Sequence, residues 1–424
     1  MKNLHFFGAY FYIFCIFLVH YWRIICNFAV EKSVVMEHLF EFYRKKVEQT
    51  NLDFFRYKFN NIKWEGKMLG IVGPRGVGKT TMMLQHIKKD LDLAKTLYIS
   101  ADQIYFSQHS LIEVAERFNK MGGTHLVVDE VHKYPSWSVE LKEIYDTYDD
   151  MQVIFSGSSV LDIYRGVGDL SRRAPIYEMQ GLSFREYLKL YHDIDVPTAT
   201  LDEVLKNEIK IGQIKHILPY FKDYLERGYY PFGRDVDFAI ELMQVVERTM
   251  ETDIPQYASL NVATGRKLQK LLMVIAESVP FKPQMTTLAS QTGISRNDIA
   301  DLILYMERAG MIAQLHSATQ GVRSLGKVDK LYLDNTNLAY ILAQKEPNMG
   351  NLRETFFYNQ TRIIGNVTYS NIADFELNGH TFEVGGHAKG KRQIADAKDG
   401  YVVKDDIEFG YGNVVPLWAF GMLY

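Results

Sequence analysis

Three glycines, a lysine and a threonine stand in the stretch "GPRGVGKT", Gly73 to Thr80, with the spacing G-x-x-x-x-G-K-[ST]. Glycines so spaced let backbone N–H groups wrap around phosphate oxygens, while Lys79 would reach the β- and γ-phosphates and the Thr80 hydroxyl would ligate Mg²⁺. The stretch therefore predicts a nucleoside triphosphate site. Its binding residues would be Gly73, Pro74, Arg75, Gly76, Val77, Gly78, Lys79, Thr80 and Thr81.

Two adjacent acids, Asp129 and Glu130, follow the apolar run 126–128. At the carboxyl end of a strand beside the loop, Asp129 would hold Mg²⁺ through water, and Glu130 would polarise the attacking water as general base. Two such acids could also simply begin a helix. An acid that activates water favours hydrolysis over a kinase reaction, because a kinase must exclude water.

Hydroxyl and guanidinium groups follow the next two predicted strands. Ser156 and Ser158 end a strand predicted over 151–159 and could sense the γ-phosphate, or they could cap the helix that follows. Arg172 and Arg173 precede another strand. Either could stabilise the transition state as an arginine finger, within one chain or between two copies, or simply lie at the surface.

The elements around these residues support the same chemistry. The segment 67–72 before the loop predicts a short buried strand, and apolar residues at helical spacing follow the loop. A chain of 424 residues suggests two to four domains, and its net charge of −3 gives no overall attraction to nucleic acid. Both cysteines lie within the first thirty residues, so no disulfide or cysteine-bound metal is expected downstream, which fits a cytoplasmic protein.

An apolar leader opens the chain over residues 1–35. Its unbroken run, 6–19, is shorter than the ~20 residues of a membrane-spanning helix, although it could extend to 30 and act as an anchor. The sequence from Met36 onward is typical of a soluble protein. We therefore expect the leader to lie outside the fold.

Helical periodicity dominates the chain after Gly181. The segment 183–260 suits a lid over the nucleotide, although a plain packing bundle would look the same. The segment 285–312 predicts a helix-turn-helix with its turn at Gly293 and a helix cap at Ser295. Its exposed face mixes basic and acidic side chains, which leaves DNA contact and protein packing both open.

Three acids in the tail match the order and spacing of endonuclease-like sites: Glu354, Asp374 and Glu383. Asp374 and Glu383 could hold a second metal ion, but the lysine expected two residues after Glu383 is replaced by Gly385. Nearby basic residues, Lys389 among them, could still bind phosphate. We therefore expect binding of DNA or RNA without cleavage, with a purely structural domain as the alternative.

The motifs "GPRGVGKTT", "VDEVHKYPSW", "FSGSS", "DLSRRA" and "GLSFREYL" together resemble prokaryotic AAA-type P-loop ATPases whose C-terminal region is a DUF4143-like domain, often compared with restriction endonucleases. The resemblance implies an α/β fold with ATP and Mg²⁺ as cofactors: a parallel P-loop sheet (36–180), a helical lid (181–265), a winged helix (266–335) and a small α/β nuclease-like domain (336–424). The residues Asp129 to His132 also spell the D-E-x-H motif of helicases, but no second ATPase lobe is recognisable after Gly181.

These features favour an ATPase that couples hydrolysis to conformational change of the attached domains, with nucleic acid as one candidate target. The alternative is a regulatory ATP switch that acts on protein partners. A homo-oligomer is compatible with either function.

Overall fold

In the computed structural model of the protein, the described residues are 36–424, except 158–169, 171, 213, 259–261, 319–327, 344, 345, 391, 395, 396 and 398. The apolar leader and Ser158 lie outside the described residues. Within the described part of the chain, no helix is both long enough and apolar enough to cross a membrane.

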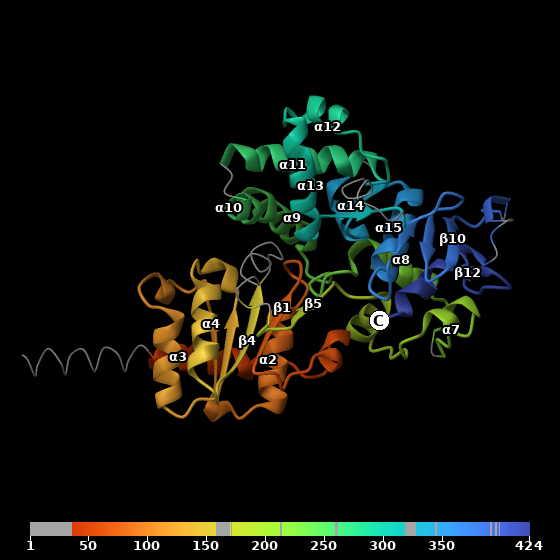
Figure 1. Ribbon diagram of the computed structural model, residues 1–424. Coiled ribbons are helices and arrows are strands. Elements are labelled where there is room, and N and C mark those ends of the chain that lie inside the picture. The colour runs from red at the N-terminus through yellow and green to blue at the C-terminus, as the bar shows by residue number, and fades with distance from the viewer. Residues whose placement is uncertain are drawn as a thin grey trace, which may run out of the picture.

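A five-stranded sheet forms the first unit, in the order β2-β3-β4-β1-β5, and every neighbouring pair is parallel. Its strands are β1 (Met68–Val72), β2 (Thr96–Ser100), β3 (His125–Asp129), β4 (Gln152–Gly157) and β5 (Ile176–Glu178). The helices that join them are α2 (Lys79–Asp90), α3 (Leu111–Lys120) and α4 (Trp137–Thr147). The strands β1 to β4 are apolar and almost wholly buried, as expected of a parallel sheet covered by helices (Figure 1). Because all strands are parallel, the loop after β1 and the polar carboxyl ends of β3 and β4 lie at the same end of the sheet.

Helices continue the chain beyond the sheet. They are α6 (Phe184–His192), α7 (Leu201–Leu205), α8 (Leu218–Arg227), α9 (Phe238–Arg248), the π-helix η5 (Thr249–Asp253), α10 (Ile254–Ala258) and α11 (Val262–Ser278). Side chains of α6, α7 and α8 join a core shared with the C-terminal part of the chain, whereas those of α9, η5, α10 and α11 join the core of the five-stranded sheet. The helices of segment 181–265 are therefore divided between two cores.

The predicted helix-turn-helix is formed by α12 (Met285–Thr292) and α13 (Arg296–Arg308). Gly293 closes α12 at a φ of +69°, and Ser295 caps α13 by accepting a hydrogen bond from the Asp298 amide at 3.3 Å. The strands β6 (Ile312–Leu315) and β7 (Lys330–Leu333) pair antiparallel after it, followed by α14 (Thr336–Leu342). This is the order of elements expected of a winged helix, an assignment that stays a prediction.

The C-terminal unit packs a helix on a mixed sheet beside the first unit (Figure 1). The helix is α15 (Met349–Thr361), and the strands are β8 (Thr368–Tyr369), β9 (Phe375–Leu377), β10 (His380–Gly385), β11 (Gly400–Lys404) and β12 (Val414–Pro416), in the order β12-β11-β10-β9-β8. The end of the described chain returns to α6, because Ser183 Oγ and Arg185 Nε donate hydrogen bonds to Tyr424 O at 2.6 and 2.9 Å.

Candidate nucleotide site

The loop between β1 and α2 has the backbone conformation that its glycines permit. Gly76 and Gly78 have φ values of +82° and +97°, and Gly78 directly precedes α2. A side chain at Gly76 would also collide with the Phe232 ring, since a Cβ built there lies 2.7 Å from it. The loop therefore requires glycine at both positions, and it leads into the amino end of a helix, where anions bind favourably.

Lys79 lies inside this loop and is almost completely buried. Its Nζ donates to Gly73 O at 2.9 Å and to Pro74 O at 2.8 Å. Burial lowers the pKa of Lys79 to about 8, against the opposing influence of the Glu130 and Asp129 charges. The ammonium group is thus held by loop carbonyls at the site where phosphate oxygens are predicted to bind.

Asp129 is the centre of a hydrogen-bond network at the end of β3. Its Oδ2 accepts from Thr80 Oγ1 at 2.6 Å and from Tyr98 OH at 2.8 Å, while its Oδ1 accepts from the Glu130 amide at 3.0 Å and from Ser156 Oγ. Burial and the Asp129 charge raise the pKa of Tyr98, so its hydroxyl stays a donor. The network fixes the carboxylate against the loop. Ser156, predicted as a phosphate sensor, belongs to this network, because its hydroxyl donates a hydrogen bond to Asp129.

Glu130 adopts a left-handed backbone conformation, with φ 53° and ψ 38°. Such a conformation is strained for a residue other than glycine and is found preferentially at functional sites. Its Oε2 lies 3.3 Å from Nδ1 of His132, a buried side chain whose pKa falls to about 3 because of burial and the nearby Lys133 charge. Glu130 is therefore a partly accessible carboxylate beside a neutral imidazole.

A buried arginine that the sequence did not single out supports the loop from outside. Arg56 Nε donates to Glu186 Oε1 at 3.0 Å, and its Nη2 donates to Gln180 O and Gly181 O, both at 2.8 Å. Its Nη1 donates to Val77 O within the loop. This one side chain therefore connects the phosphate loop to the start of α6.

Glu186 belongs to the "GLSFREYL" motif, and the structure explains the motif locally. The Ser183 hydroxyl accepts from the Glu186 amide at 3.1 Å, and Glu186 Oε2 accepts from the Ser183 amide at 3.2 Å, which completes a capping box. The pattern S-x-x-E was the one signal from which this cap could have been read. Nothing in it indicated that the same carboxylate binds Arg56.

A cavity of about 380 Å³ opens at the α2 end of the loop. Its lining includes Asn51, Phe54, Gly78, Thr81, Met82 and Pro231. Gln85 orders one wall, because its Nε2 donates to Asn51 O at 2.9 Å and to Phe54 O at 2.7 Å. The cavity is adjacent to the predicted phosphate site and presents both apolar surface and backbone polar groups.

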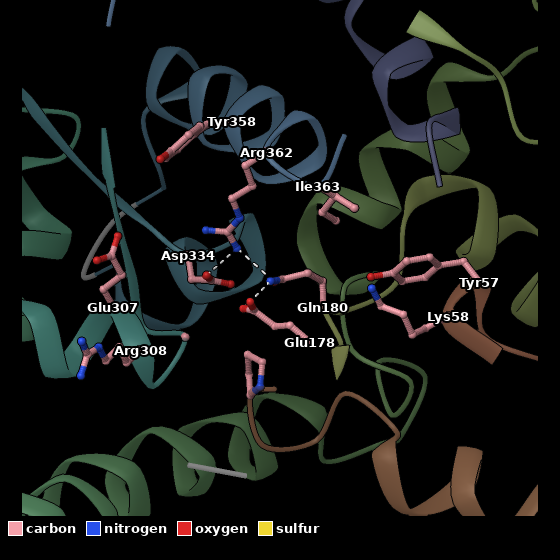
Figure 2. A pocket seen from close by; sticks show the side chains of 12 residues that line it. Tyr57, Lys58, Glu178, Gln180, Glu307, Arg308, Asp334, Tyr358, Arg362 and Ile363 are labelled. Atoms are coloured by element: carbon pink, nitrogen blue, oxygen red, sulfur yellow. Dashed lines mark hydrogen bonds and ion pairs between the residues drawn. The ribbon is translucent and has the colours of Figure 1, made fainter. Parts of the chain in front are cut away.

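A second cavity, of about 520 Å³, lies where three parts of the chain meet near Pro74. Figure 2 shows Arg362 directed at Asp334 and Gln180, with Nη2 to Asp334 Oδ1 and Gln180 Oε1 distances of 2.6 and 3.2 Å. Gln180 in turn donates to Glu178 Oε1 at 3.1 Å. This polar network joins β5, at the edge of the five-stranded sheet, to the ends of β7 and α15.

The two candidate arginine fingers lie away from the loop of their own chain. Arg172 is exposed, and Arg173 makes a bidentate pair with Asp146 on α4 through Nε and Nη2, each at 2.9 Å. Ile176 pairs with Gly70, and Arg173 precedes β5, so Arg173 lies toward the amino ends of the strands, where it and Lys67 both lie over the Tyr145 ring, whereas the phosphate loop follows the carboxyl end of β1. Within one chain, this position does not suit a finger.

The three acids of the C-terminal unit come close together, but each of them is paired with a lysine. Lys330 Nζ lies 3.0 Å from Glu354 Oε2 and 3.4 Å from Asp374 Oδ1, and Lys389 Nζ pairs with Glu383 Oε1. Burial and Asp374 raise the pKa of Glu354, and burial raises that of Glu383. Among the described residues, no group of three or more His, Cys, Asp or Glu side chains has metal-binding geometry.

Comparison with known proteins adds family information to this geometry. Residues 65–188 match the AAA domain family, and residues 218–348 match a domain of unknown function, DUF8612. The chain is 25% identical over 299 residues to the uncharacterized protein MJ1637 of Methanocaldococcus jannaschii, a match that covers 65% of this chain and 62% of that protein. It thus spans less than two thirds of that relative.

Two solved structures show weaker similarity. The Walker-type ATPase PABY2304 of Pyrococcus abyssi is 12% identical with a TM-score of 0.43, covering 68% of this chain and 95% of that one. The S. cerevisiae Hsp104–ADP complex is 18% identical with a TM-score of 0.26, covering 63% and 37%.

The parallel sheet, the glycine loop and the Thr80–Asp129 contact define a P-loop nucleoside triphosphatase fold. The match over residues 65–188 assigns this part of the chain to the AAA domain family, and a domain of unknown function follows it at residues 218–348. The matched domain differs from the DUF4143-like domain that the sequence suggested, so that part of the assignment stays a prediction.

Proposed function

We propose that this chain binds and hydrolyses ATP with Mg²⁺ and couples hydrolysis to movement of the units attached to its AAA-type core. The observation that best supports the site is the 2.6 Å hydrogen bond from Thr80 Oγ1 to Asp129 Oδ2. It joins the phosphate loop to the acidic end of β3, next to Glu130. These are the groups that hydrolysis of a nucleoside triphosphate requires.

The residues at this contact fit a magnesium ion. Mg²⁺ prefers hard oxygen ligands, and the Thr80 hydroxyl and the Asp129 carboxylate are two oxygen donors on neighbouring elements. They would hold the ion, which would neutralise charge on the phosphates. Tyr98 and Ser156 would keep the Asp129 carboxylate in one orientation throughout.

The chain's own groups supply the other roles. Lys79 would exchange the carbonyl oxygens of Gly73 and Pro74 for phosphate oxygens, which are stronger acceptors for an ammonium group. Glu130 would accept a proton from the attacking water. Its partly exposed carboxylate, fixed by a strained backbone, supports this assignment over a purely structural one.

Adenosine would occupy the 380 Å³ cavity at the α2 end of the loop. Thr81 and Gly78 line both the cavity and the loop, so a base and ribose placed there would continue directly into the phosphate site. The main-chain groups of Asn51 and Phe54 are held in place by Gln85 and would give the base a polar edge to recognise.

Two close contacts support coupling to the attached units. The Phe232 ring lies against Gly76 of the loop, and Gly310, at a φ of +73°, lies against Pro74, where an added Cβ would be 2.5 Å from the proline ring. A change in loop conformation on nucleotide binding would therefore move against both the segment before α9 and the turn after α13. The Arg362 network beside Pro74 would carry the change to α15.

Phosphate release from Mg²⁺-ATP tests the proposed activity. We expect Lys79→Ala to abolish both ATP binding and phosphate release, while Lys120→Ala, on the exposed surface of α3, leaves both unchanged. Unaltered ATP affinity of Lys79→Ala, measured by calorimetry, would contradict the site.

We propose nucleic acid as the second candidate partner. Arg296 and Asn297 are exposed at the start of α13, while the apolar face of that helix is buried: Ile299, Leu302, Ile303 and Met306. We also keep the proposal that the tail binds DNA or RNA without cleavage, with Asp374 and Glu383 as a second metal site only if their lysines are displaced. Stimulation of the ATPase by DNA or RNA supports this partner; no effect of either favours a regulatory switch acting on protein.

We propose further that Arg173 acts between copies in a homo-oligomer. Arg173 lies before β5, the edge strand of the sheet, away from the phosphate loop of its own chain, and its side chain is partly exposed. Arg173→Ala should then lower turnover without lowering ATP affinity. Sedimentation that shows only monomers at saturating ATP, with full activity, would contradict this role.

A further inference from the structure

One carboxylate from the helical segment binds two cations of the nucleotide site. Asp253, at the end of η5, is only 7% exposed. Its Oδ2 accepts from Arg75 Nη2 at 3.0 Å, and its Oδ1 accepts from Lys133 Nζ at 2.9 Å. Arg75 belongs to the phosphate loop, and Lys133 follows Glu130 by three residues. We call this group the ion triad.

The ion triad lies at the end of the loop opposite the adenosine cavity. That cavity is bounded by Gly78 and Thr81, whereas the ion triad involves the third residue of the loop and the turn after Glu130. The charges of Arg75 and Asp253 both influence the pKa of Lys79, although burial dominates it, so the triad is within electrostatic reach of that ammonium. Lys79 is the residue expected to meet the β- and γ-phosphates. The triad therefore borders the γ-phosphate end of the site.

The two cations of the ion triad, Arg75 and Lys133, can bind a further anion. Two positive groups and one carboxylate leave a net charge of +1. Arg75 Nε is buried and has no hydrogen-bond partner among the described residues, although its neighbouring Nη2 binds Asp253. A guanidinium group presents five donors in a fork that matches phosphate oxygens. A phosphate oxygen at this edge would satisfy a donor that the protein leaves unpaired.

We propose that Arg75 and Lys133 recognise the γ-phosphate of ATP, and that Asp253 is the group they exchange for it. The inference rests on the proposed ATP site. A γ-phosphate carries more charge than one carboxylate and competes for both cations, whereas ADP ends at the β-phosphate and leaves the ion triad intact. Arg75 and Lys133 thus make the site prefer ATP over ADP, and Asp253, which competes with the γ-phosphate for both cations, limits that preference.

The same exchange releases η5 from the loop only when ATP is bound. The helices around η5 have their own apolar packing, with Met250, Ile254, Leu268 and Leu272 all buried. Opening the ion triad would remove this polar connection between η5 and the loop, while the apolar packing of the helices stays in place. The segment that connects α9 to α11 would therefore differ in position between the ATP-bound and the ADP-bound protein.

Affinities for ATP and ADP, measured by calorimetry in a Glu130→Gln background that prevents hydrolysis, test the proposal. Asp253→Asn keeps the shape of the side chain and removes the competing charge. We expect it to raise the preference for ATP over ADP by roughly fivefold to tenfold, the size of a weak coupling between sites. Lys133→Gln should change the preference in the opposite direction. Asp149→Asn is the matched control, because this carboxylate is 97% exposed and lies before the amino end of β4, beside Lys67 and away from the phosphate loop.

Amide hydrogen exchange over residues 238–258 gives the second readout. We expect ATP, but not ADP, to increase exchange there in the Glu130→Gln protein, and Asp253→Asn to show increased exchange without nucleotide. If Asp253→Asn and Lys133→Gln alter ATP and ADP binding equally, the ion triad is a structural connection only, and the inference is wrong while the ATP site stands. If the parent protein binds neither nucleotide, the proposed function fails first, and the inference fails with it.

Discussion

Replacing Arg56 with methionine should destabilise the protein and weaken the nucleotide loop in one step. Arg56 and Glu186 are 5% and 1% exposed, so their ion pair is shielded from water. Burial opposes the charge of Arg56, but Glu186 raises the pKa of the guanidinium above its usual value, which keeps it charged. Removing one partner of such a buried pair typically costs about 3–5 kcal/mol, because the other charge is left buried and unpaired.

We therefore expect Arg56→Met to lower the free energy of unfolding by about 4 kcal/mol. With a urea dependence of about 3 kcal/mol per molar, the midpoint of unfolding should fall by about 1.3 M, measured by circular dichroism. The hydrogen bond to Val77 O is lost as well, so the loop should relax and ATP affinity of the folded variant should fall.

Lys120→Met is the control for the Arg56 variant. Its pair with Glu116 on α3 is exposed, with side-chain exposures of 71% and 49%, and such a pair is worth about 0.5 kcal/mol or less. A shift for Arg56→Met no larger than that of Lys120→Met would refute the claim that a buried ion pair holds the loop. A large shift with unchanged ATP affinity would refute only the link to the loop.

Three further predictions follow from particular side chains. His132 is buried and its pKa is lowered to about 3, so the free energy of unfolding should fall by about 2 kcal/mol between pH 7 and pH 5, as the pH drops below the usual histidine pKa. His132→Gln should flatten this pH dependence of stability, and an unchanged slope in the variant would contradict the prediction. Gly76→Val should abolish ATP binding in a fluorescence titration, because the left-handed backbone and the Phe232 ring leave no room, and normal binding would contradict the loop geometry. Removal of residues 1–35 should leave ATP affinity unchanged. Removal of residues 1–50 should lower the melting temperature, because Leu39 and Tyr43 are buried in the core of the five-stranded sheet. Equal melting temperatures of the two shortened proteins would contradict this role of residues 36–50.

The phosphate loop, Asp129 and Glu130 could be predicted from sequence because their chemistry depends on residues that are close along the chain. The spacing of glycines, lysine and threonine itself predicts the nucleotide site, and the strand before each motif was visible as an apolar run. β1, β3 and β4 were all found where those runs predicted them.

Tyr98 and Arg56 were missed because their partners lie far along the chain. Tyr98 is 31 residues from Asp129, and it meets that carboxylate because β2 is placed beside β3. Arg56 is 130 residues from Glu186. Neither contact has a local pattern, so only the order of the strands and the path of the chain reveal it.

The same limit applied to the helical segment and the tail. Apolar periodicity indicates that a helix has a buried face but not which core receives it, so the division of α6–α8 from α9–α11 could not be foreseen. The order of Glu354, Asp374 and Glu383 was predicted as a metal-binding pattern. Lys330, which pairs with two of them, comes from β7, before the predicted domain begins.

Single-turnover hydrolysis of Mg²⁺-ATP by the parent protein and by Glu130→Gln tests the central claim most directly. Glutamine keeps the size of the side chain but cannot accept the proton of the attacking water. We predict that Glu130→Gln binds ATP with the affinity of the parent protein and releases phosphate at least about 100-fold more slowly, the usual effect of removing a general base. Phosphate release at the parent rate would contradict an ATPase site built on Thr80, Asp129 and Glu130.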